Sequence, residues 1–160
     1  MLKIFISSTY ADLKEYREAV NEQLHRMKVN GVQMEYFSSS LDEPTSKSLE
    51  ELKKCNVYIG IIGHRFGTIS PDQKHSITER EYMEAHDLYK KDAMRCLIYL
   101  ADEEKVHIPP KLMESDELRE RQQKFRQSLN RHTYKIFRSP SELAAWVAAD
   151  LYSLDQVPPP

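Results

Sequence analysis

One stretch decides the fold of this chain: VYIGIIGHRFGTISPDQKHSITEREYMEAHDL, residues 57–88. Its first part, Val57 to Gly63, is an apolar run with the length and composition of a fully buried strand. After a polar loop, a helix is predicted to begin at Ser76, because Ser76 and Glu79 have the spacing of a capping box with Ser76 as the N-cap. The stretch is therefore predicted to be a strand, a loop and a helix in succession.

Glu81 falls in the middle of the apolar side of this helix. At roughly 100° per residue, that side carries Ile77, Ala85, Leu88 and Tyr89. A carboxylate that faces a core is costly unless it is paired or set in a polar pocket. A salt bridge or a position at the rim of the core would account for Glu81 as well as a functional role would, so the surrounding residues have to decide.

The composition is that of one soluble globular domain. The chain has 160 residues, of which 40% are hydrophobic and 30% are charged. The domain is predicted to span residues 1–153. The tail, residues 154–160, ends in three prolines and is typical of a linker, so we expect it to lead to a C-terminal region that is missing.

Net charge and cysteine usage limit which binding partners and which cellular compartment are expected. A net charge of −2 provides no basic field to recruit nucleic acid. No apolar run approaches the ~20 residues of a membrane span, and no signal peptide precedes the first strand. Cys55 and Cys96 lack metal-site spacing and are typical of reduced thiols. We therefore expect a cytoplasmic protein that binds neither nucleic acid nor membrane.

Strands and helices alternate along the whole chain. Besides Val57–Gly63, apolar strands are predicted at Leu2–Ile6, Val32–Phe37, Arg95–Leu100 and Thr133–Phe137. A helical pattern follows each strand. This alternation predicts an α/β fold: a five-stranded parallel sheet in the order 2-1-3-4-5, with helices on both faces, as in flavodoxin-like proteins.

Short signals mark the ends of the helices. Thr9 and Asp12 have the spacing of a weaker capping box for the first helix, and Asn30-Gly31 predicts its end. Ser139-Pro140-Ser141-Glu142 predicts the start of the last helix, whose inner face is predicted to include Trp146.

Sheets of this kind bind ligands beyond the carboxyl ends of their strands, at the switch point between the first and third strands. Here that point is formed by the loops Ser7–Tyr10 and Gly63–Ser76, and Glu81 lies little more than one turn further on. Gly63 to Gly67 could bring backbone and Arg65 near an anion, or could be a turn that needs glycine. Aromatic residues at the predicted mouth, Tyr10 and Phe66, could stack on a base or a nicotinamide ring, or could simply pack.

Several common chemistries are absent from the sequence. The four glycines form neither a Walker motif nor a dinucleotide fingerprint. The six histidines include no pair with metal-site spacing on a helix, so no metal is expected. Ser7 and Ser8 lack a Ser-His-Asp partner set, which argues against a hydrolase triad. The charged segment Arg119 to Arg131 is predicted to be a solvated helix face.

Two segments of the chain resemble the DUF4062 family. They are KIFISSTYADL (residues 3–13), with Arg17 after it, and IIGHRFG (61–67), followed by SITEREY (76–82). The resemblance covers Lys3 to about Lys91. It implies a fold related to Toll/interleukin-1 receptor (TIR) domains. It also implies a place at the N-terminus of larger NTPase proteins of the NACHT and related STAND signalling classes, including antiviral defence proteins.

The resemblance also implies an activity. Enzymatic TIR domains and nucleoside deoxyribosyltransferases carry a glutamate on the helix after the third strand, and Glu81 matches that place. As the catalytic residue, it would stabilise the oxocarbenium-like state formed when the nicotinamide–ribose bond of NAD is cleaved. NAD would be the substrate, and no cofactor would be needed. Substrate contacts are expected from Ser7, Ser8, Tyr10, Arg65, Phe66 and Ser76.

The sequence thus predicts an NAD glycohydrolase effector that becomes active when its parent protein clusters it. Two other functions remain open. One is a non-catalytic module for homotypic protein–protein interaction. The other is nucleoside or nucleotide glycosyl transfer with Glu81 as the nucleophile. Because no large apolar stripe is present, the isolated domain is expected to be monomeric or weakly associating.

Overall fold

The computed structural model describes residues 2–33 and 44–156. Five strands form one sheet in the order β2-β1-β3-β4-β5, and all neighbouring strands are parallel. The strands are β1 (Lys3–Ser7), β2 (Asn30–Gln33), β3 (Val57–Ile62), β4 (Arg95–Ala101) and β5 (Tyr134–Phe137). The predicted α/β class and parallel sheet are confirmed.

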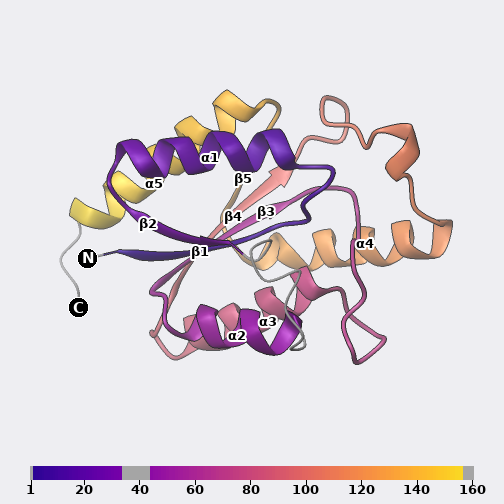
Figure 1. Cartoon of the computed structure of the whole chain (residues 1–160), viewed down its shortest axis with the longest axis horizontal. Coiled ribbons are helices and arrows are strands. Elements are labelled where there is room, and N and C mark those ends of the chain that lie inside the picture. The colour runs from indigo at the N-terminus through magenta and orange to yellow at the C-terminus, as the bar shows by residue number, and fades with distance from the viewer. Residues whose placement is uncertain (1, 34–43, 157–160) are drawn as a thin grey trace.

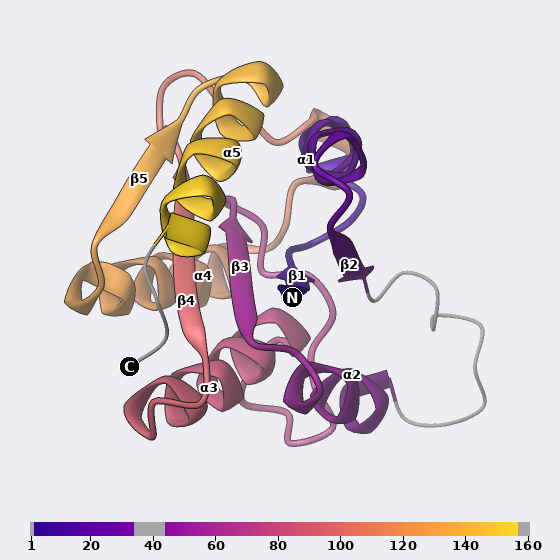
Figure 2. The same cartoon turned by 90° about the vertical axis from the view of Figure 1, so that its left-hand side faces the viewer.

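Helices cover both faces of the sheet (Figures 1 and 2). α1 and α5 pack on one face, and α2, α3 and α4 lie on the other. The helices are α1 (Lys14–Arg26), α2 (Pro44–Lys53), α3 (Ile77–Lys90), α4 (Asp116–Ser128) and α5 (Pro140–Gln156), with short 3₁₀ turns η2 (Pro110–Leu112) and η3 (Leu129–Arg131). None of the helices in the described ranges combines the length and apolar character needed to cross a bilayer.

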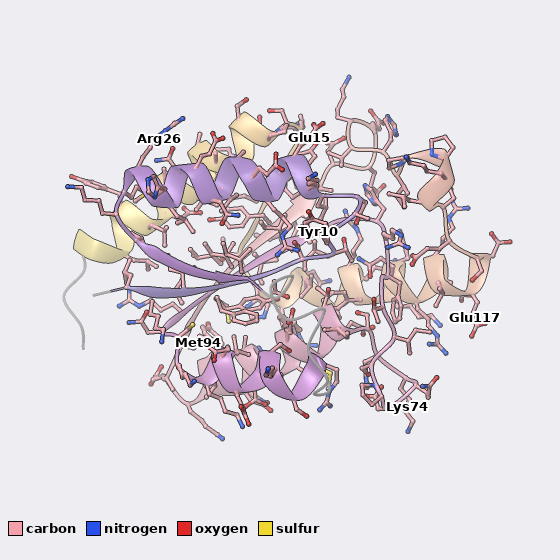
Figure 3. All side chains as sticks on the ribbon, in the orientation of Figure 1. Tyr10, Glu15, Arg26, Lys74, Met94 and Glu117 are labelled. Atoms are coloured by element: carbon pink, nitrogen blue, oxygen red, sulfur yellow. The ribbon has the colours of Figure 1, made fainter. Side chains whose placement is uncertain are left out.

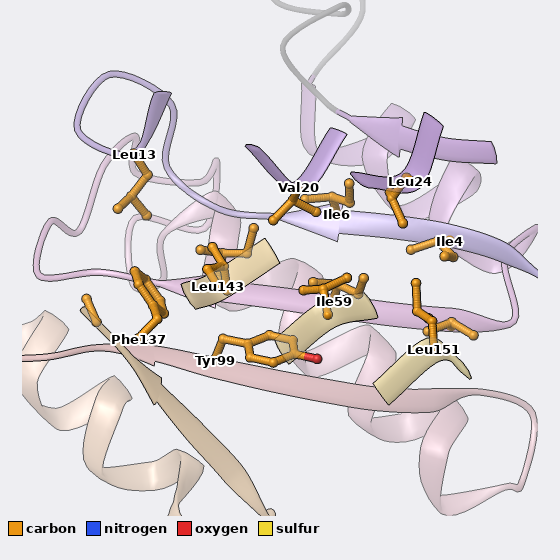
Figure 4. Close-up of a cluster of buried hydrophobic side chains, with 14 of the residues drawn as sticks. Ile4, Ile6, Leu13, Val20, Leu24, Ile59, Tyr99, Phe137, Leu143 and Leu151 are labelled. Atoms are coloured by element: carbon orange, nitrogen blue, oxygen red, sulfur yellow. The ribbon is translucent and has the colours of Figure 1, made fainter. Parts of the chain in front are cut away.

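The core consists of two apolar clusters separated by the sheet. Ile4 and Ile6 of β1 face α1 and α5, as Figure 4 shows, and Phe5 between them faces α2 and α3. Every residue of β3 is buried, with Tyr58 and Ile59 at 0% exposure on opposite faces. Burial on both faces explains why the strand reads as an uninterrupted apolar run.

The first helix begins later than predicted. α1 begins at Lys14, and its N-cap is Leu13, whose apolar side chain cannot accept a hydrogen bond. The capping box predicted at Thr9 and Asp12 is therefore wrong. Asp12 instead lies in the loop that packs against β3, where a Cβ on Gly63 would be 3.3 Å from its Oδ2 atom.

The end of α1 and the start of β2 also differ from prediction. Lys28 adopts the left-handed conformation (φ 59°) just past the helix. The Lys28 amide donates to the His25 carbonyl, and the Val29 amide donates to the Leu24 carbonyl. This is a C-terminal cap of the Schellman type. Asn30-Gly31 is therefore not the helix stop but the beginning of β2, two residues ahead of the predicted strand Val32–Phe37. Residues 34–37 of that prediction lie outside the described residues.

The last helix departs from prediction on its inner face and at its end. The Ser139 hydroxyl caps it by accepting a hydrogen bond from the Glu142 amide at 3.2 Å, as predicted. Trp146, predicted to face inward, is 38% exposed, with the Lys135 ammonium 4.7 Å from its ring centroid. α5 continues to Gln156, so the first three residues of the predicted linker are helical. Residues 157–160 lie outside the described residues.

Candidate functional site

A cleft of about 290 Å³ opens at the carboxyl ends of β1 and β3, where the strand order reverses. Tyr10, on the loop between β1 and α1, marks this end of the sheet in Figure 3. The cleft is lined by Ser8, Thr9, Tyr10, Ala11, Arg17, Arg65, Gly67, Thr68, Ile77, Thr78 and Glu81. The site predicted at the switch point thus coincides with a real depression in the surface.

The capping box of α3 sets the position of Glu81. Ser76 accepts a hydrogen bond from the Glu79 amide at 3.0 Å, and the Glu79 carboxylate accepts one from the Ser76 amide at 3.1 Å. With the helix start fixed in this way, Glu81 falls on its buried side together with Tyr82 and Ala85. The predicted inward position of Glu81 is confirmed. Tyr89, which was placed on the same side, is 47% exposed.

Glu81 is a buried carboxylate whose two oxygens differ in their hydrogen bonding. The residue is only 2% exposed. The Ser7 hydroxyl donates to Oε1 at 2.7 Å, whereas Oε2 has no hydrogen-bond partner within the described residues. Burial raises the pKa of Glu81 to about 7, although the hydroxyls of Ser7 and Ser48 and the charge of Arg17 act in the opposite direction. Near neutral pH the group can therefore exist in both protonation states.

The floor of the site is shaped by β1 and β3. Ser7 is paired with Gly60 in the sheet, and the Tyr58 ring lies over Gly60, where an added Cβ would come within 2.8 Å of it. Glycine is needed here because the ring occupies the space of a side chain. The Tyr58 hydroxyl is buried, and burial raises its pKa well above the ordinary value. Tyr58 thus remains a neutral, space-filling group beside Glu81.

The loop after β3 binds an anion, one of the two alternatives that the sequence left open, and that anion belongs to the chain itself. The carboxylate of Glu114 accepts hydrogen bonds from the amides of Phe66 at 2.6 Å and Gly67 at 3.0 Å. The Arg65 Nε atom lies 3.9 Å from the same carboxylate and donates to the Leu112 carbonyl at 3.0 Å. These contacts join the segment before α4 to the rim of the cleft.

Some of the predicted substrate residues meet in the cleft. Ser8, Tyr10 and Arg65 line it with Glu81, and Ser7 lies beneath, bonded to the carboxylate.

Two other predicted residues do not line the cleft. Phe66 is 1% exposed, so its predicted place at the mouth is wrong; its backbone amide binds Glu114 while its ring is buried, with the Arg121 guanidinium 5.9 Å from the ring centroid. Ser76 is also 1% exposed and serves as the helix cap. Both residues thus stabilise elements next to the cleft: Phe66 the loop after β3, and Ser76 the start of α3.

Sequence reasoning missed two residues that line the cleft with Glu81, the charged Arg17 and the hydroxyl-bearing Thr78. Arg17 of α1 is 4% exposed, its guanidinium lies 5.5 Å from the Tyr10 ring centroid, and its charge acts on the pKa of Glu81. Thr78, one helical turn before Glu81 on α3, also lines the cleft. The helical spacing of three from Glu81 would have identified Thr78.

Gln122 and Arg126 of α4 were also missed, because the segment was predicted to be a solvated face. Both side chains are buried and bond to the ends of the central strands. The Gln122 amide nitrogen donates to the Gly63 carbonyl at 2.8 Å. Arg126 donates to the carbonyls of Ile62 (3.0 Å), Gly63 (3.2 Å) and Ala101 (2.7 Å). Gln122 lies three residues before the buried Phe125 and Arg126 three residues before the buried Leu129, and this helical spacing was the available signal.

No group of three or more His, Cys, Asp or Glu residues that could hold a metal ion occurs in the described part of the chain.

Comparisons with known proteins identify the family and the fold. A family model described as "Domain of unknown function (DUF4062)" matches residues 3–152. Among solved structures, the chain is similar to the TIR domains in the structure of the activated Roq1 resistosome directly recognizing the pathogen effector XopQ. The TM-score is 0.63 at 9% sequence identity, over 94% of this chain and 99% of that one. No curated protein matches the sequence.

Proposed function

The chain belongs to the DUF4062 family, and we propose that it is a TIR-like effector domain that hydrolyses the nicotinamide–ribose bond of NAD when it is clustered. One observation carries the proposal: Glu81 lies at a cleft at the switch point of the sheet, buried, with an oxygen that has no hydrogen-bond partner among the described residues. Buried polar atoms are nearly always paired, so an unpaired carboxylate oxygen beside a cleft calls for an explanation. A ligand bound in the cleft would supply one.

The proposed reaction matches the chemistry of a buried carboxylate. As the bond between ribose and nicotinamide breaks, its electron pair leaves with the nicotinamide nitrogen and the ribose carbon becomes positively charged. Water adds to that carbon and loses a proton, which gives ADP-ribose and nicotinamide. Ionised Glu81 would stabilise the positive charge, and its low-dielectric surroundings strengthen that interaction. Activity should accordingly rise as the pH passes upward through the Glu81 pKa of about 7.

The charge of the cleft supports an anionic substrate. Arg17 and Arg65 both line it, and each can approach a phosphate. Tyr10, which is 48% exposed, presents an aromatic ring beside the Arg17 guanidinium. An aromatic face and two cations near one carboxylate fit a dinucleotide better than they fit a neutral nucleoside, which is why NAD hydrolysis is proposed ahead of glycosyl transfer.

Clustering is expected to increase the activity. The similar TIR domains belong to a resistosome, and we carry that property to this chain as part of the proposal. Fused to a scaffold that holds several copies together, the domain should release nicotinamide from NAD at least about tenfold faster per copy than the monomer, because a neighbouring copy helps to order the site. Nicotinamide release is followed by chromatography at equal domain concentration. Equal rates in both forms would contradict activation by clustering.

One observation favours a second function, a non-catalytic interaction module. Glu81 is 2% exposed and already bonded to Ser7, so in this state little of the carboxylate reaches the surface. A module of this kind would assemble through its surface, and it would keep its self-association after substitution of Glu81. The absence of nicotinamide release from a clustered chain that still assembles would favour this second function.

A further inference from the structure

The Glu114 carboxylate occupies a preformed anion-binding site. Two consecutive backbone amides, of Phe66 and Gly67, point at it, and the Arg65 side chain flanks it. Successive N–H groups that converge on one point form a nest, an arrangement that binds carboxylates and phosphates alike. Gly67 has φ +79°, the left-handed conformation that such a turn requires.

This nest adjoins the cleft that holds Glu81. Arg65 and Gly67 contribute to the nest and also line the cleft. The loop comes so close to the β1 end that a Cβ on Gly67 would lie 2.8 Å from the Thr9 Cγ2 atom. The nest at the rim is therefore within reach of an anionic group on a molecule bound in the cleft.

Glu114 reaches the nest from a distant part of the sequence. It lies between η2 and Ser115, the N-cap of α4, and its side chain is 6% exposed. A single carboxylate offers one negative charge to two amides and a guanidinium. A phosphate or diphosphate offers more charge and more acceptor oxygens to the same donors, and hydrogen bonds of this charged kind are strong.

We propose that the nest of Arg65, Phe66 and Gly67 is a binding site for phosphate groups, and that Glu114 is an internal ligand which a phosphate-bearing molecule displaces. The proposal rests on the proposed function for the identity of that molecule, the diphosphate of NAD. While Glu114 is bound, it competes at the high local concentration of a tethered group. Phosphate affinity is therefore held down until Glu114 leaves.

Removal of Glu114 tests the proposal directly. In the complete chain, Glu114→Ala should bind pyrophosphate at least about tenfold more tightly than the wild type, because no competitor has to be displaced. Isothermal calorimetry measures the affinities. The matched control is Glu117→Ala, on the exposed side of α4, where the side chain is 75% exposed. It should bind like the wild type. Adding Arg65→Gln to Glu114→Ala should remove the gain.

Further ligands identify the source of the phosphate. If both pyrophosphate and ADP-ribose gain affinity in Glu114→Ala, the nest accepts phosphate from either source. If only ADP-ribose gains, the nest accepts the diphosphate of a nucleotide alone. Adenosine, which has no phosphate, should show no gain; an equal gain for adenosine would overturn the proposal. Because these are binding measurements, they remain valid even if the chain proves unable to cleave NAD.

A purely structural role for Glu114 predicts different results. Glu114→Ala would then lose stability and bind neither pyrophosphate nor ADP-ribose more tightly than the wild type, and this result would overturn the proposal. Should the alanine variant fail to fold, Glu114→Gln keeps the size and an acceptor oxygen while removing the charge. It should still bind pyrophosphate more tightly than the wild type. Unfolding of both variants would identify Glu114 as a structural tie and reject the proposal.

Discussion

Glu81→Gln is expected to abolish nicotinamide release from NAD by the clustered domain while leaving the fold intact. The substitution keeps the size of the side chain and an oxygen that can accept the Ser7 hydrogen bond, which is 2.7 Å long. It removes the negative charge that we propose stabilises the developing positive ribose. Loss of one such electrostatic partner typically costs about 10²–10³-fold in rate. Initial rates of nicotinamide release, with folding checked by circular dichroism, provide the measurement.

Glu79→Gln is the matched control, two residues away on the same helix. Glu79 accepts a hydrogen bond from the Ser76 amide in the capping box, and its amide oxygen could still do so after substitution. Activity should remain close to the wild-type value. Equal activity in the wild type and Glu81→Gln would remove the enzymatic hypothesis and leave the interaction module.

The same Glu81→Gln variant should gain stability relative to the wild type as the pH rises. Burial raises the pKa of Glu81 from 4.5 to about 7, so the folded state holds a proton that the unfolded state has released between these values. Wild-type stability therefore falls across that interval, by on the order of 3 kcal/mol in total. Glutamine has no such titration. Denaturant unfolding of both proteins at pH 4.5, 6 and 8 would show the difference widening with pH; a constant difference would contradict it.

The layout of the sheet follows from periodic signals that are local in sequence. Buried strands such as Val57–Ile62 read as apolar runs, and the Ser76 capping box fixed the phase of α3 well enough to place Glu81 on the buried side. The errors lie where tertiary contacts override local patterns. The left-handed residue that follows α1 is Lys28, a residue type that does not signal a helix end. Thr9 and Asp12, which were predicted to cap α1, lie in the loop before it.

The site was predicted in outline because the carboxyl ends of parallel strands converge at a switch point whatever the loop sequences are. Its composition was harder to predict, because several of its groups come from distant segments. Glu114 reaches the nest from 47 and 48 residues away, and no local pattern marks a glutamate as the partner of backbone amides. For Phe66 the sequence left stacking on a ligand and simple packing both open, and its ring is buried.

Arg126→Leu is expected to destabilise the chain more than any surface substitution on α4. The buried guanidinium satisfies three carbonyl oxygens at the ends of β3 and β4, those of Ile62, Gly63 and Ala101. Leucine fills part of the space but removes the guanidinium donor from all three carbonyls, of which Gly63 keeps the hydrogen bond from Gln122. Each buried polar group that is left unpaired costs about 1–3 kcal/mol.

The loss in Arg126→Leu should reach roughly 3–5 kcal/mol, the range for breaking a buried charged network. Chemical denaturation at fixed pH gives the free energy of unfolding. Arg119→Leu, on the same helix with a side chain that is 53% exposed, is the control and should change the free energy of unfolding by less than about 0.5 kcal/mol.

Because Arg126 and Gln122 together hold the Gly63 carbonyl at the start of the anion-binding loop, Arg126→Leu should also loosen that loop. Faster amide hydrogen exchange at Phe66 and Gly67 would report this change. A loss of stability with unchanged exchange at these two amides would confine the role of Arg126 to the ends of the strands.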